Sequence, residues 1–186
     1  IQLLISGRGT KESYEEQGEL QLTDYGISGI PVFQLSRFAA AALDAGRQVK
    51  ASIDFLPGFR DNEALWQELV EEKCTSCRQR SMEVLFGGLV NKKIIQTAVK
   101  LCGLSMGDRA ERKNLPAIRK VFALLRSFEV QVTDTNPFAN AQVCAGGVPL
   151  TEVDGHLESR ICPGLYLAGE LLDADGRCGG YNLQWA

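Results

Sequence analysis

The chain has 186 residues and a formal net charge of -3, from 20 Lys and Arg against 23 Asp and Glu. With 45% hydrophobic and 23% charged residues, its composition is that of a globular protein and argues against a disordered or collagen-like chain. The acidic balance argues against a general affinity for nucleic-acid phosphates, and no apolar run approaches the ~20 residues of a membrane span. We therefore expect a folded protein without a nucleic-acid or membrane partner.

Alternation of apolar and polar residues predicts three strands, over residues 19–23, 49–55 and 128–133. Strands with this pattern bury only one face, which favours an antiparallel sheet or a barrel. A helix over 32–43 is predicted between the first two strands. Its signals are Ser28 or Gly29 as a cap, Pro31 for the first turn and Gly46 as the end.

Three more helices are predicted in the middle of the chain, each beginning at a residue that can cap. Asp61 precedes a helix over 63–73, and Asn91 precedes one that Gly103 ends. Asn114 precedes the third, in which apolar residues recur at helical spacing. The connector 108–113 interleaves acids with bases, so we interpret it as a solvated face rather than a nucleic-acid contact.

The six cysteines predict neither a metal site nor a disulfide framework. Only Cys74 and Cys77 have the spacing of metal or redox ligands, and no second close pair accompanies them. The single histidine, His156, is interpreted as a surface turn residue. Cys178 is interpreted as a small packed side chain, with a reactive thiol of lowered pKa as the alternative. Because the spacing is untypical of a secreted disulfide-rich protein, we expect a cytoplasmic one.

Residues 141–186 are rich in glycine and suggest an α/β arrangement. Short strands are predicted over 141–144 and 165–168, and a helix is predicted to begin near Gly180. Open α/β sheets bind ligands where their strands end, so Glu170 or Asp173 could accept hydrogen bonds from ribityl or ribose hydroxyls. Glycines before a helix start suit a phosphate, a carboxylate or the edge of a flavin. The alternative is a plain loop with a nearby acid.

Three blocks carry a family resemblance. They are Pro163-Gly164-Leu165-Tyr166-Leu167-Ala168-Gly169-Glu170 with its continuation to Ala186, Gly18-Glu19-Leu20-Gln21-Leu22-Thr23 with its continuation to Pro31, and Ala141-Gln142-Val143-Cys144-Ala145-Gly146-Gly147-Val148. In their order along the chain, 18–31, 141–148 and 163–186, they resemble the HI0933-like (YhiN-type) family of NAD(P)/FAD-dependent oxidoreductases, also labelled aminoacetone oxidase-like. The sequence departs from the family pattern at three positions, Asp24, Ile30 and Cys144.

The resemblance implies an α+β fold in three parts. A β-barrel-like Greek-key insert subdomain would occupy 1–56 and 127–140, and a small helical subdomain 57–126. Residues 141–186 would be a remnant of a Rossmann-like FAD-binding domain. The glycine motif that holds the pyrophosphate in such domains is absent, since its nearest imitation, 7–12, ends in Glu12 and precedes no helical pattern.

The resemblance also implies a set of cofactor-binding residues and no metal ligand, and it does not identify the catalytic residues. Gly169 and Glu170 would lie near the FAD ribityl and phosphate, and Asp173 would support the loop that follows or cap its turn. The backbone at Gly146 and Gly147 would approach the ring system, or form a plain turn. The loop over the flavin pyrimidine edge would consist of Gly179, Gly180, Tyr181 and Asn182.

The function that the resemblance implies is that of an FAD-dependent oxidoreductase, with a small-molecule substrate and NAD(P)H as a candidate reductant. The sequence begins at Ile1 without Met and stops inside the glycine-rich block, so we expect a piece of a longer polypeptide. The missing N-terminal FAD-binding domain would then be its partner, and the isolated chain would be inactive and retain no FAD. The alternative is a stand-alone binding or interaction module without enzymatic activity.

Overall fold

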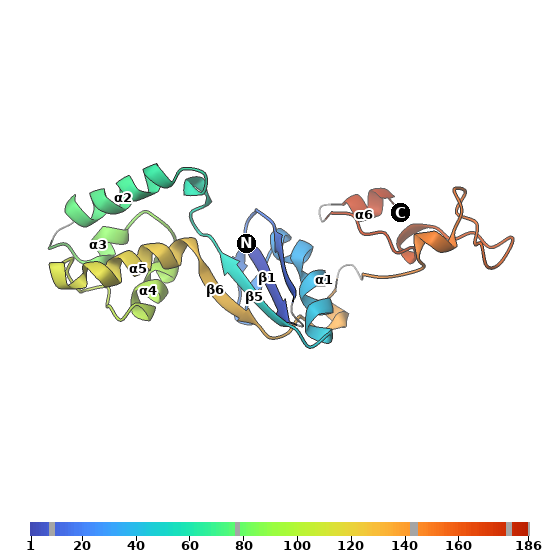
Figure 1. The fold of residues 1–186 in the computed structure, drawn as a ribbon, viewed down its shortest axis with the longest axis horizontal. Coiled ribbons are helices and arrows are strands. Elements are labelled where there is room, and N and C mark those ends of the chain that lie inside the picture. Colours follow the sequence, from blue (N-terminus) through green and yellow to red (C-terminus); the bar gives the residue numbers. More distant parts are fainter. Residues whose placement is uncertain (8–9, 77–78, 142–144, 178–179, 186) are drawn as a thin grey trace. The chain divides into compact units, whose positions relative to one another are not determined.

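The structure is a computed structural model that describes residues 1–7, 10–76, 79–141, 145–177 and 180–185 (Figure 1). The chain divides into two compact units. One comprises 1–49 with 132–186 and is called the sheet unit here, and the other comprises 50–131 and is called the helical unit. The class is α+β, as predicted.

A four-stranded sheet has the order β2-β1-β5-β6. Its strands are β1 (Gln2–Gly7), β2 (Thr10–Glu15), β5 (Gln48–Ile53) and β6 (Phe128–Val132), and β1 and β2 are antiparallel with Leu3 opposite Tyr14. The strands predicted over 49–55 and 128–133 are thereby confirmed. Of the segment 7–12, Gly7 ends β1 and Thr10, Lys11 and Glu12 begin β2.

A second antiparallel pair consists of β3 (Gln21–Leu22) and β4 (Ile27–Ser28). The strand predicted over 19–23 is therefore too long. Thr23 explains the difference, because its amide and its hydroxyl both donate to the carbonyl of Gly26, at 2.9 and 3.2 Å. This turn stops the strand after two residues. The Greek-key closure of a barrel stays a prediction.

Helix α1 (Ile30–Asp44) confirms the helix predicted over 32–43, with Pro31 in its first turn. Its cap position is Gly29, at φ +104, where a Cβ would collide with the carbonyl oxygen of Glu19. The helix packs an apolar stripe on the sheet, and Phe38 stacks on Tyr14 with ring centroids 3.9 Å apart. The buried members of this core are Leu3, Ile5, Leu35, Ala39, Ala42 and Val49.

The helical unit contains α2 (Glu63–Ser76), α3 (Met82–Phe86), α4 (Lys92–Leu101) and α5 (Leu115–Arg126), green to yellow in Figure 1. Its core centres on aromatic rings: Phe122 lies 4.9 Å from Phe86 and 5.7 Å from Trp66, between ring centroids. Sequence analysis missed α3, although Phe86 is fully buried. The predicted helices correspond to α2, α4 and α5.

The caps of these helices follow the prediction at one of three sites. Asn91 accepts the amide of Lys93 at 2.9 Å, which confirms it as the cap of α4. At α2 the accepting side chain is Asn62 rather than Asp61, since the amide of Leu65 donates to Asn62 Oδ1 at 2.9 Å. Asn114 makes no capping hydrogen bond and instead donates its side-chain amide to the carbonyl of Arg109 at 2.8 Å.

Residues 145–185, called the C-terminal segment here, contain little regular structure. The helix predicted near Gly180 is present as α6 (Tyr181–Trp185). The strand predicted over 165–168 is wrong, because only an isolated bridge joins Tyr166 to Glu158 and a 3-10 turn follows at Gly169–Leu171. The strand predicted over 141–144 lies largely outside the described residues. Within the ranges that the structure covers, no helix is long and apolar enough to cross a membrane.

The aromatic core predicts a large effect of Phe122→Ala. Removing a buried ring without refilling its volume should lower the free energy of unfolding by about 3–5 kcal/mol. Urea unfolding followed by Trp66 fluorescence, in a Trp185→Phe background, measures it. Val84→Ala is the control, because Val84 is 50% exposed on α3 and should change stability by less than about 0.5 kcal/mol. Equal effects of the two substitutions would contradict this account of the core.

The cap of α4 predicts that Asn91→Ala lowers the free energy of unfolding by about 1 kcal/mol, because the amide of Lys93 loses its acceptor. The same urea experiment measures the loss. Gln96→Ala, at an exposed position inside the same helix, should leave stability almost unchanged. A loss at Gln96 as large as that at Asn91 would argue against the cap.

Candidate functional site

Gly147 lets two stretches of the C-terminal segment meet. The amide of Val148 donates to the carbonyl of Leu171, and the amide of Asp173 donates to the carbonyl of Val148, both at 2.9 Å. Val148 and Leu172 thereby form a parallel bridge. A Cβ on Gly147, at φ +154, would lie 2.5 Å from the Leu171 oxygen, so this position requires glycine. The close approach observed here is to the chain's own backbone, and a cofactor contact at Gly146 and Gly147 stays a prediction.

Asn182 closes a second turn. The amide of Gly176 donates to Asn182 Oδ1 at 2.6 Å, and a Cβ on Gly176 would lie 2.7 Å from the same oxygen. Gly180, at φ +92, precedes α6, and its carbonyl accepts the amide of Gln184 at 3.0 Å. The side-chain oxygen of Asn182 thus accepts from the backbone, and its amide hydrogens have no acceptor among the described residues.

Two long-range ion pairs tie this turn to the rest of the sheet unit. Arg37, on α1, donates to Asp175 at 2.5 Å, and Arg177 donates to both carboxylate oxygens of Glu16 at 2.8 and 3.0 Å. The two pairs flank Gly176. Because both pairs are partly exposed, they orient the turn more than they stabilise it.

Glu170 and Asp173 present exposed carboxylates. Glu170 lies in the 3-10 turn that begins at Gly169, whose φ is +73. Neither side chain hydrogen-bonds to a residue that the structure describes. An ionised carboxylate of this kind can accept hydrogen bonds from two hydroxyl groups, as the ribityl or ribose part of a cofactor would require.

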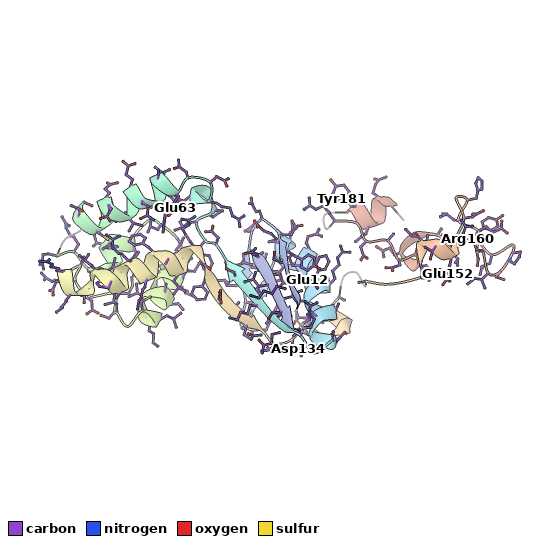
Figure 2. All side chains as sticks on the ribbon, viewed as in Figure 1. Glu12, Glu63, Asp134, Glu152, Arg160 and Tyr181 are labelled. Atoms are coloured by element: carbon purple, nitrogen blue, oxygen red, sulfur yellow. The ribbon has the colours of Figure 1, made fainter. Side chains whose placement is uncertain are left out.

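Charged residues hold the loop that lies between Val148 and Gly169 in the sequence. The backbone amide of Arg160 donates to the carbonyl of Glu152 at 2.8 Å, and Arg160 Nε donates to the carbonyl of Val153 at 2.9 Å; Figure 2 labels Glu152 and Arg160. Asp154 accepts the amides of Glu158 and His156 at 2.9 and 2.8 Å. These amides, that of Glu158 first, hold the pKa of the Asp154 carboxyl below its ordinary value. His156 is exposed in this turn, as predicted.

Apolar side chains of the C-terminal segment remain largely uncovered. Among those described, Val153 and Leu172 are buried, but neither belongs to one of the two apolar cores of the chain. Tyr181, labelled on α6 in Figure 2, is 63% exposed. The other exposed apolar side chains of the segment are Leu150, Leu157, Ile161, Leu165, Tyr166 and Leu171.

The predicted cofactor residues thus fall into two groups. In the first group, Gly147 lies against the backbone of 171–173, directly after Gly169 and Glu170. In the second group, Gly180, Tyr181 and Asn182 lie at the start of α6, where Asn182 accepts the amide of Gly176. Among the described residues, no hydrogen bond joins a residue of the first group to a residue of the second. Gly179 lies outside the described residues.

The described cysteines and acids offer no metal site. Over the ranges with coordinates, no three His, Cys, Asp or Glu side chains come close enough to hold an ion. Cys74 is buried in the helical core, and burial raises the pKa of the Cys102 thiol. The interpretations of Cys77 and Cys178 concern residues that the structure does not describe.

Sequence reasoning missed Asp175 and Arg177 as organising residues. Their only local signal is a charged pair on either side of Gly176 inside a glycine-rich block. The partners, Arg37 and Glu16, lie far away in the sequence, and a single sequence carries no information about such pairs.

Comparison with known proteins adds a family and three relatives. The model of the "HI0933-like protein barrel and H2TH domain" matches residues 2–143. A "3-dehydro-bile acid delta(4,6)-reductase" of Clostridium scindens is 40% identical over 173 residues, which cover 92% of this chain and 42% of that protein.

Two proteins named "Ribosomal RNA dihydrouridine synthase" are more distant relatives. That of Haemophilus influenzae is 28% identical over 169 residues and that of Escherichia coli over 168 residues, each match covering 90% of this chain and 39% of the relative. The chain spans about two fifths of the length of these relatives. The family match covers more than half of the chain and agrees with the three resembling sequence blocks, so the chain belongs to the HI0933-like family.

Proposed function

We propose that the chain is part of an FAD-dependent oxidoreductase, and that its C-terminal segment belongs to a Rossmann-like domain that binds the cofactor. The observation that carries the proposal is the 40% identity to a reductase over 173 residues, which are 92% of the chain. The division into an insert of 1–56 and 127–140, a helical part of 57–126 and a cofactor part of 141–186 is part of the same proposal.

The packing of the C-terminal segment supports this placement. Its apolar side chains have no core of their own among the described residues, so we infer that the remainder of an FAD-binding domain covers them. The parallel bridge between Val148 and Leu172 is consistent with that domain, because strands of a Rossmann-like sheet run parallel.

The described residues fit part of such a cofactor. The exposed carboxylates of Glu170 and Asp173 would accept hydrogen bonds from hydroxyl groups of the ribityl chain. The side-chain amide of Asn182 and the ring of Tyr181 would face the flavin. Gly146, Gly147, Gly169 and Gly180 would shape the backbone around it. A bound flavin supplies two-electron transfer, and NAD(P)H is the proposed reductant.

The names of the relatives suggest a reaction class. A delta(4,6)-reductase and a dihydrouridine synthase both add two hydrogens to a carbon–carbon double bond. We propose that the whole protein reduces a double bond conjugated to a carbonyl. FAD, held by the residues named above, would supply the two electrons of the reduction, and two hydrogens would be added across the double bond. A small molecule is the first candidate substrate and RNA the second. We also propose a cytoplasmic location, because the wide and irregular spacing of the six cysteines is untypical of a secreted disulfide framework.

The competing function is a binding module without enzymatic activity. It requires the C-terminal segment to be stable by itself, whereas a cofactor domain requires the segment to be completed by other residues. Hydrogen exchange of 145–185 separates the two. Slow exchange in the isolated chain would favour the module, and fast exchange that slows in the longer protein would favour the cofactor domain.

We expect the isolated chain to purify without stoichiometric flavin, and the longer protein that contains it to purify with FAD. The reason is that the chain lacks the glycine motif that would hold the pyrophosphate. The flavin absorbance spectrum measures both. Stoichiometric flavin on the isolated chain would overturn the first expectation, and a longer protein without flavin would overturn the oxidoreductase proposal.

In the longer protein, Asp173→Ala should weaken FAD binding about tenfold or more, since a hydrogen bond to a charged group contributes about 1.5–3 kcal/mol. Titration of the apoprotein with FAD, followed by flavin fluorescence, measures the dissociation constant. Glu152→Ala, in the same segment but outside the predicted site, is the control and should change it less than about twofold. Equal losses for both variants would remove Asp173 from the site.

A further inference from the structure

Charge is distributed unevenly between the two units. Residues 50–131 hold 14 Lys and Arg against 10 Asp and Glu, whereas the remaining residues hold 6 against 13. The helical unit is therefore basic and the sheet unit acidic. The net charge of the whole chain, on which the expectation of no nucleic-acid partner rests, averages these two opposite parts.

The basic residues gather on part of the helical unit. Residues 92–126, which contain α4 and α5, hold nine Lys and Arg but only two acids, Asp108 and Glu111. Helix α2 has the opposite balance, with four Glu and one Lys. An acidic helix and a basic pair of helices thus belong to the same small body, which concentrates the positive potential on the α4–α5 side.

Ion pairs neutralise some of these bases but not all. Arg119 and Arg126 of α5 pair with Glu71 and Glu63 of α2, at 2.5 and 2.8 Å, and Glu63 is labelled in Figure 2. Lys92 and Lys113 also have acidic partners. Among the residues with described placement, no ion pair engages Lys93, Lys100, Arg109, Arg112 or Lys120.

Three of the unpaired bases lie on the solvent side of the helix pair. Helix α4 buries Ile95, Ala98 and Val99, so Lys93 and Lys100, seven residues apart and both exposed, lie on its opposite face. On α5, the exposed Lys120 lines a shallow hollow of about 470 Å³. Leu101 and Cys102, which directly follow Lys100 in the sequence, line the same hollow. We call Lys93, Lys100 and Lys120 the lysine face.

We propose that the lysine face of the helical unit binds the phosphate backbone of RNA. Flexible, exposed and unpaired ammonium groups bind phosphates chiefly by charge and release counterions when they do so. Their complement is a polyanion, and RNA is the one that the proposed function already names as a candidate substrate. The inference rests on that function only for the choice of RNA, because the lysine face needs no cofactor.

The charge mechanism sets the expected salt dependence. Three contacts with a single strand should give a slope of about −2 for the logarithm of the association constant against the logarithm of salt concentration. Between 50 and 200 mM salt the affinity should then fall about twentyfold. A contact made by apolar burial would show no such slope.

The experiment measures fluorescence anisotropy of a labelled single-stranded RNA oligonucleotide with the whole 186-residue chain. The variant K93E/K100E should bind about tenfold or more weakly than the wild type. The matched control K11E/K50E makes the same change in net charge at exposed positions outside α4 and α5, and should lose less than about twofold. The variant K120E tests whether α5 takes part in binding, and it should weaken RNA binding as well. Thermal unfolding checks that each variant folds, and K93Q/K100Q replaces K93E/K100E if it does not.

Three outcomes would overturn the proposal: no salt-dependent RNA binding, equal losses in both double variants, or binding to vesicles of anionic phospholipid without binding to RNA. The last would assign the lysine face to a membrane surface. Since the measurement uses the chain without flavin, failure here leaves the oxidoreductase proposal untouched. Failure to find flavin in the longer protein likewise leaves RNA binding untouched.

Discussion

The burial of apolar surface in two places but not in a third is the constraint on which the rest of the molecule depends. The rings of Trp66, Phe86 and Phe122 close one core, and α1 on the sheet closes another. The described residues of the C-terminal segment form no equivalent core, and side chains such as that of Ile161 are 72% exposed. This difference is the reason for our proposal that the remainder of an FAD-binding domain covers the segment.

Much of the fold could be predicted because its signals are local. The alternation over 49–55 and the spacing of apolar residues after Asn114 each report which face of one element is buried. Helix α3 was not predicted, because five residues are too few to show the helical period of apolar residues, even though Phe86 and Leu85 are fully buried. The strand predicted over 165–168 failed for a related reason: an apolar run forms a strand only where a neighbouring strand accepts it.

The candidate site divides along the same line. Glycine-rich blocks could be recognised in the sequence, and the structure gives Gly147 and Gly176 local reasons to be glycine. The ion pairs of Asp175 with Arg37 and of Arg177 with Glu16 could not be foreseen, because they join residues more than 130 positions apart. The opposite charges of α2 and the α4–α5 pair were visible in the sequence but meaningful only once the helices were placed in one body.

Strand β2 has a further consequence for how the protein behaves at high concentration. It lies at the end of the four-stranded sheet, where the backbone amides and carbonyls of its outer edge face away from β1. Such an edge can recruit a strand from another molecule and start aggregation. In β2 the charged residues Lys11, Glu12 and Glu15 occupy half of the six positions, and Glu12 is held in place by Arg47 at 2.9 Å. Charged side chains along an edge disfavour the addition of another strand, because they would have to give up part of their hydration when a neighbour packs against them.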